Sequence, residues 1–168
     1  MRYRIRPEKS GCGNYTGSSP KTKIMRTLSS LISAVESLNL NNIILESMDQ
    51  ASPTYLEQQK EQMSYAVNEK GQMIGKYRSA AYARKKNQMN PNAGYGNVDL
   101  KLTGSFYEAM EAKAQPEGMN INSTDQKSQM LQQKYGSDIF GLFGEWKEPF
   151  VEKLQTVVTE LLTEQLNA

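Results

Sequence analysis

The sequence predicts a fold of the α+β class, with several α-helices, a β-hairpin and an amphipathic helix at the C-terminus. Two observations predict it. Apolar residues recur at helical spacing over 21–38 and 146–165. Apolar and polar residues alternate over 119–123, directly after the turn-forming residues 116–118, and this combination is typical of a hairpin.

The N-terminal residues form a basic arm, in which Arg2, Arg4 and Arg6 alternate with apolar residues. Such alternation is typical of a short edge strand or an extended arm. A stretch rich in glycine, serine and asparagine follows and predicts a linker. Because 168 residues usually form one domain, we expect an arm and linker over 1–20 and a single α+β domain over 21–168.

Three helical segments are predicted in the first half of the domain. The first spans 21–38, where apolar residues form one stripe. A second begins near Asn42 and is expected to end at Ser52-Pro53, where a third begins. Serine is a good N-cap and proline fits the first helical position, where its missing N–H costs nothing. The third helix is expected to end near Asn68.

The middle of the chain is punctuated by turns. We predict a turn region over 69–76 and a loop over 88–97, while the secondary structure of the basic, tyrosine-rich residues 77–87 stays open. Residues 105–115 fit either a helical face or a strand. We predict a strand there, because the turn that follows leads into the alternating residues 119–123.

The last part of the chain is predicted to hold a short helix over 126–134, a loop over 135–144 and a long helix over 146–165. The long helix has one continuous apolar stripe. We expect that stripe to be its buried face, made by Phe150, Leu154, Val157, Val158, Leu161 and Leu162.

The composition argues against several chemistries. The chain has no histidine, the commonest general base and transition-metal ligand, and the lone Cys12 cannot form an intrachain disulfide. Asp99, Asp125 and Asp138 lie in separate segments with no acid–base or metal spacing, so we expect them to be surface acids or turn formers. We therefore expect no enzymatic activity, no cofactor and no metal.

No apolar run approaches the roughly 20 residues that span a bilayer. The basic N-terminus is not followed by the apolar region of a secretory signal. We therefore expect a soluble, cytoplasmic protein that does not contact a membrane.

One candidate interaction segment combines tyrosine with basic residues: Tyr77, Arg78, Tyr82, Arg84, Lys85 and Lys86. Such residues contact phosphates and bases in nucleic acids, and they are also enriched at protein–protein interfaces. The near-even balance of 20 basic and 18 acidic residues favours the protein–protein alternative. Arg2, Arg4 and Arg6 of the arm have the same two alternatives, contact with nucleic acid or contact with another protein.

Two further stretches carry candidate interaction residues. The Thr103-Gly104 turn is expected to set the direction of the hairpin, since glycine tolerates backbone angles that other residues resist, and Phe106 follows it. The glycine-bounded loop 135–144 contains Ile139, Phe140 and Leu142. We expect these three to cap the core; the alternative is that they form an exposed docking patch.

Five stretches, in this order, carry a resemblance: 69–77, 82–85, 98–106, 123–127 and 135–142. Together they resemble small neck, tail-completion and minor-tail proteins of tailed bacteriophages, of the virion-morphogenesis type and particularly as in phages and prophages of Bacteroides-like hosts. The resemblance covers about residues 40–165.

The resemblance implies that a small antiparallel sheet packs on long helices. It also implies a homo-oligomeric ring at the head–tail connector, neck or tail-completion layer, in contact with other neck, portal or tail proteins and without enzymatic activity. The protein would then be found in the virion, and in the host cytoplasm during assembly. A ring requires two different patches on each subunit. If DNA passes through the lumen of the ring, the subunit would lie near DNA. The alternative function is a small nucleic-acid-binding accessory protein.

Overall fold

The computed structural model describes residues 27–167. Its elements confirm the α+β class, with helices and a two-stranded antiparallel sheet. The predicted arm, with Arg2, Arg4 and Arg6, lies outside the described residues. In chain order the elements are α1 (Leu28–Glu36), α2 (Leu40–Ser64), α3 (Ala80–Met89), α4 (Ser105–Glu108), β1 (Met110–Gln115), β2 (Gly118–Ser123), α5 (Ser128–Tyr135) and α6 (Glu148–Asn167), with short 3₁₀ turns at Pro91–Ala93, Ser137–Ile139 and Gly144–Lys147.

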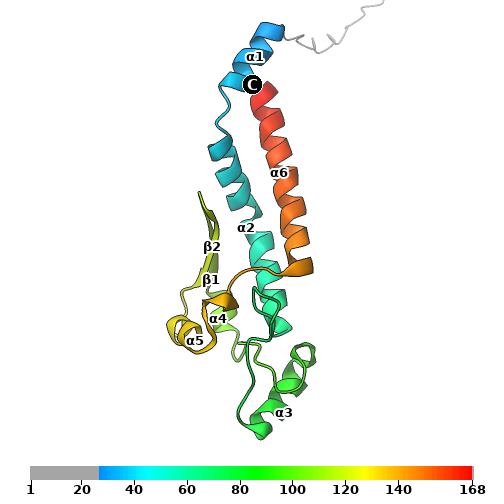
Figure 1. Ribbon diagram of the computed structural model, residues 1–168, viewed down its shortest axis with the longest axis vertical. Coiled ribbons are helices and arrows are strands. Elements are labelled where there is room, and N and C mark those ends of the chain that lie inside the picture. The colour runs from blue at the N-terminus through cyan, green and yellow to red at the C-terminus, as the bar shows by residue number, and fades with distance from the viewer. Residues whose placement is uncertain (1–26, 168) are drawn as a thin grey trace, which may run out of the picture.

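The molecule is elongated around two long antiparallel helices (Figure 1). Helices α2 and α6 lie side by side, with α1 at one tip next to the end of α6. The hairpin of β1 and β2 lies along α2, and α3 lies at the opposite end. Near the start of α6, the rings of Tyr55 and Phe150 meet edge to face with centroids 5.0 Å apart. The described part of the chain therefore has a helical tip, a sheet beside its middle and an α3 end.

The main core lies where the end of α2 meets the hairpin and the connecting loops. Its buried members come from the end of α2, from α4, from the start of β1 and from the connecting loops: Met63, Ile74, Val98, Phe106, Tyr107, Met110, Ile139 and Phe140. On α6, Val157 is buried, while the other five residues of the predicted apolar stripe are half-buried. The main core cluster therefore lies at one end of the long helices, while α2 also buries Ile43, Ser47 and Met48 nearer its start.

The predicted break at Ser52-Pro53 is wrong, because α2 continues through Pro53. Proline inside a helix removes one backbone hydrogen bond. Here Ala51 is fully buried just before it and Tyr55 packs on Phe150 just after it, so packing on both sides keeps the helix continuous. The helix then ends at Ser64, earlier than predicted, because Ala66 adopts φ +61° and cannot continue it.

The predicted hairpin is confirmed, except for the first half of its first strand. Strand β1 pairs with β2, with Ala112 opposite Ile121. The strand predicted from residue 105 begins only at Met110, because Gly104 takes φ +96° and leads into one turn of helix. Within the described residues, the first predicted helix is α1, capped by Thr27.

Candidate functional site

Helix α3 organises the tyrosine-rich segment whose structure the sequence left open. The side chain of Ser79 accepts a hydrogen bond from the N–H of Tyr82 at 3.3 Å, which is the usual N-cap contact. The helix ends at Met89, and its C-cap Asn90 precedes Pro91. Asn90 donates to the carbonyl oxygen of Ser64 at 2.7 Å, so α3 is attached to the end of α2.

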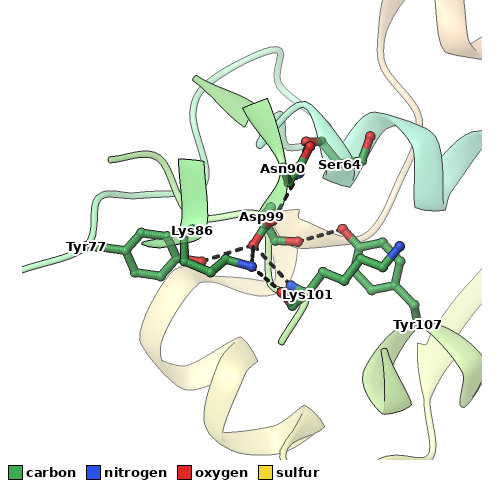
Figure 2. A network of polar contacts seen from close by, with 7 residues as sticks. All are labelled: Ser64, Tyr77, Lys86, Asn90, Asp99, Lys101 and Tyr107. Carbon is green, nitrogen blue, oxygen red and sulfur yellow. Dashed lines mark hydrogen bonds and ion pairs between the residues drawn. The ribbon is translucent and has the colours of Figure 1, made fainter. Parts of the chain in front are cut away.

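An ion pair is buried beneath α3 (Figure 2). The Nζ atom of Lys86 lies 2.8 Å from Oδ1 of Asp99, and the two side chains are 5% and 1% exposed. Lys86 also donates to the carbonyl oxygen of Lys101. The prediction that Asp99 is a surface acid is therefore wrong. Asp125 and Asp138 are half-buried, and Asp138 pairs with Lys70.

The Asp99 carboxylate is surrounded by donors from several segments. Tyr77 donates its hydroxyl to Oδ1 at 3.0 Å, and Asn90 donates its amide to Oδ2 at 3.0 Å. The backbone N–H of Lys101 donates to Oδ1 at 3.2 Å. The hydroxyl of Tyr107 donates to the backbone carbonyl of Asp99. These bonds provide the partners that a buried carboxylate requires.

The electrostatics hold this network in one protonation state around neutral pH. Burial by itself raises the pKa of Asp99, but hydrogen bonds from Lys86, Asn90 and the Lys101 N–H outweigh it, so the net pKa is lowered. Burial, followed by the negative charge of Asp99, raises the pKa of both Tyr77 and Tyr107. The carboxylate therefore stays ionised and the phenols stay protonated, which suits a structural network better than an acid–base pair.

A mostly apolar pocket of about 170 Å³ adjoins the network. It brings together five residues that the sequence predicted to be interaction residues in separate stretches: Tyr77, Tyr82, Thr103, Gly104 and Phe106. The rings of Tyr77 and Tyr82 meet edge to face with centroids 4.9 Å apart. Phe106 is buried, whereas Thr103 is exposed.

Two other segments complete the pocket. Leu131 and Tyr135 contribute from α5, and Leu100 contributes from the loop that carries Asp99. Leu100 has φ +55°, a left-handed conformation that costs a branched residue energy and persists only where its surroundings impose it. Asp99 and Lys101, on either side of Leu100, are both tied into the network.

The remaining predicted residues lie elsewhere. Arg84 and Lys85 are exposed on α3 and do not line the pocket. Ile139, Phe140 and Leu142 are buried, so they belong to the core and do not form an exposed docking patch. The basic run was predicted to be an interaction surface as far as Lys86, and for Lys86 this is wrong, because its side chain is buried against Asp99. The roles of Asp99 and Asn90 in this network were not predicted from the sequence. One signal was present for Lys86, because it follows the small Ala83 by three residues and shares its helical face.

The chain matches no family model and no curated protein, and its structure matches no solved structure. Among residues 27–167, no helix is both long and apolar enough to cross a bilayer. In the same residues, no three histidine, cysteine, aspartate or glutamate side chains gather closely enough to hold a metal ion.

Proposed function

We propose that this chain is a structural subunit of a tailed-bacteriophage virion. In this proposal it forms a homo-oligomeric ring at the head–tail connector, neck or tail-completion layer and acts through contacts with neighbouring subunits and with other neck, portal or tail proteins. It has no enzymatic role. The proposal rests on the ordered resemblance of the five stretches, and its main structural support is the pocket where residues from those stretches meet.

The size and lining of the pocket suit an anchor from another protein. An apolar cavity of about 150 Å³ accommodates benzene, so 170 Å³ suits one aromatic or branched aliphatic side chain. Such anchors, inserted into well-formed pockets, carry much of the binding energy of protein interfaces. Behind the pocket, the Asp99 network holds its walls in place.

Light scattering and negative-stain microscopy of the purified chain, alone and with candidate virion partners, test the proposal. Closed rings are the expected result. Ser105→Trp should reduce the formation of oligomeric rings, because Ser105 is exposed and lines the pocket, and an indole side chain there would fill the opening. Gln129→Trp is the matched control, since Gln129 is exposed on α5 outside this pocket. A chain that remains monomeric with every partner would contradict the proposal.

The second candidate function is nucleic-acid binding. One observation favours it: Arg78, Arg84 and Lys85 are exposed near α3, and no acid within residues 27–167 forms an ion pair with any of them. Three phosphate contacts would give duplex binding that weakens with salt at a log–log slope of about −3. Measurement of DNA affinity across salt concentrations tests this function, and the ring proposal expects weak or absent binding.

A further inference from the structure

The two ends of the elongated molecule, the helical tip and the α3 end, differ in charge. The helical tip contains no lysine or arginine over 27–50 or 154–167, whereas Glu36, Glu46 and Glu160 are exposed there. The α3 end is the reverse: residues 76–101 contain six basic residues and a single acid, the buried Asp99 that pairs with Lys86. The described part of the subunit is therefore electrostatically polar along its length.

The tip also exposes several apolar side chains of α1 and of the start of α2. We call these side chains, together with Glu36, Glu46 and Glu160, the acidic tip. No residue of α1 is buried, although its apolar residues recur at helical spacing. Large exposed apolar patches mark assembly surfaces. The exposed apolar side chains of α1 and of the start of α2 are Leu28, Leu31, Ile32, Val35, Leu40 and Ile44.

At the opposite end, a second cavity of about 330 Å³ has a mixed lining, in which Met89, Lys101 and Leu102 lie beside Asn92, Thr103 and the buried Lys86–Asp99 pair. Met89 and Leu102 are 54% and 57% exposed. Lys85 precedes Met89 by four residues on α3, so the two share one helical face. We call Lys85, Met89, Lys101 and Leu102 the basic end.

We propose that the acidic tip of one copy docks on the basic end of a second copy. The carboxylates meet lysines, while the leucines and isoleucines of the tip cover Met89 and Leu102. This inference rests on the proposed ring, which requires a heterologous contact between two different patches.

The two surfaces cannot meet within one molecule. Helix α2 has 25 residues, and at 1.5 Å per residue it is about 37 Å long. Leu40 begins α2 at the tip, and Ser64 ends it where Asn90 attaches α3. A second tip is also a poor occupant of the tip, because exposed carboxylates on both copies would repel each other.

Charge reversal tests the contact. One variant reverses the tip with Glu46→Lys and Glu160→Lys. These residues lie nine and ten positions from the contacting Tyr55 and Phe150, and hence at about the same level on the antiparallel helices. The other variant reverses the basic end with Lys85→Glu and Lys101→Glu. Each is expected to weaken self-association about tenfold or more, and the chain with all four reversals is expected to regain it.

Matched controls reverse exposed charges on α2 and α6 away from the tip, on the hairpin and in the turn before α6. Glu57→Lys with Glu152→Lys, near the end of α2 and the start of α6, should leave association unchanged, and so should Lys113→Glu with Lys147→Glu. Sedimentation over a range of concentrations reports association, and thermal unfolding checks that each variant folds. Association should also weaken as salt rises, since exposed charges are screened.

The outcomes separate this interface from the proposed ring. Unchanged association in the reversed variants, or no recovery in the fourfold variant, overturns the interface even if rings form. The tip-reversed variant can also be combined with reversal of Arg2, Arg4 and Arg6 to glutamate. If association recovers only in that combination, the interface is overturned and the tip binds the basic N-terminal residues instead. Dimers or open chains that follow the charge reversals support the interface and reject the ring. A wild-type chain that is monomeric throughout overturns both.

Discussion

At the scale of single residues, neighbours in a basic run have different roles. Lys85 is exposed, whereas Lys86 is buried against Asp99. A buried charge that loses its partner destabilises a protein by about 3–5 kcal/mol, even where the intact pair contributes little net stability. The pair therefore makes the placement of α3 sensitive to one side chain.

Lys86→Met is accordingly expected to lower the free energy of unfolding by about 3–5 kcal/mol, because it leaves the Asp99 carboxylate without its cation. Urea denaturation measures the change. The adjacent Lys85→Met is the control and should stay within about 0.5 kcal/mol of wild type, as exposed substitutions usually do. Similar unfolding midpoints for the two variants would show that the ion pair does not hold α3.

The pH dependence of stability follows from the same network. The pKa of Tyr107 is raised in the folded state, so its contribution is fully present below the unfolded pKa of about 10 and is lost as the pH rises above it. Tyr107→Phe should therefore flatten the alkaline fall in stability. Unfolding free energies measured from pH 8 to about 11 test this, and equal slopes in both proteins would contradict it.

The acidic side has the opposite sign. The pKa of Asp99 is lowered in the folded state, so its contribution is present above the unfolded pKa of about 4 and is lost as the pH falls below it. In Asp99→Asn, we expect a shallower loss of unfolding free energy below about pH 4 than in wild type. The same titration, continued downwards, measures it, and an identical acid limb would refute the assignment.

At the scale of elements, α2 holds a loop through two buried glutamines. Gln59 donates to the carbonyl oxygen of Ile139 and accepts from the N–H of Gly141. Gln62 donates to the carbonyl oxygen of Gly141 at 2.9 Å and accepts from the N–H of Phe143 at 2.7 Å. These side chains replace the strand partner that a buried loop lacks.

Gln62→Met should lower the free energy of unfolding by about 2–3 kcal/mol, because it preserves most of the volume but leaves two backbone groups of the loop without partners. Gln50→Met, on an exposed site of the same helix, is the control and should have little effect. Chemical denaturation compares the two. Equal stability of both variants would indicate that water replaces the lost bonds.

At the scale of the whole molecule, stability is uneven. The core cluster lies around the end of α2 and the hairpin, whereas α1 has no buried residue. Segments with few buried contacts open locally at a small fraction of the global unfolding free energy. In the isolated subunit, amides of α1 should therefore exchange with solvent much faster than those of α2 near Met63. Native-state hydrogen exchange tests this, and equal protection would show that the tip is covered.

The elements that depend on local signals followed from the sequence. Helical spacing predicted the long C-terminal helix, and turn residues with alternation predicted the hairpin up to Ser123, because these patterns act over a few neighbouring residues. The continuous α2 did not follow, since the cost of Pro53 is local while the packing of Ala51 and Tyr55 is not.

The sequence by itself determined the α+β class, the apolar faces and the stretches from which the pocket is built. Only the tertiary structure decided that Tyr77 and Thr103 line one pocket, that Asp99 is buried, and that Ile139 belongs to the core. The physical reason is distance along the chain. Periodicity and turn chemistry operate between near neighbours, whereas burial and ion pairing depend on which distant segments pack together.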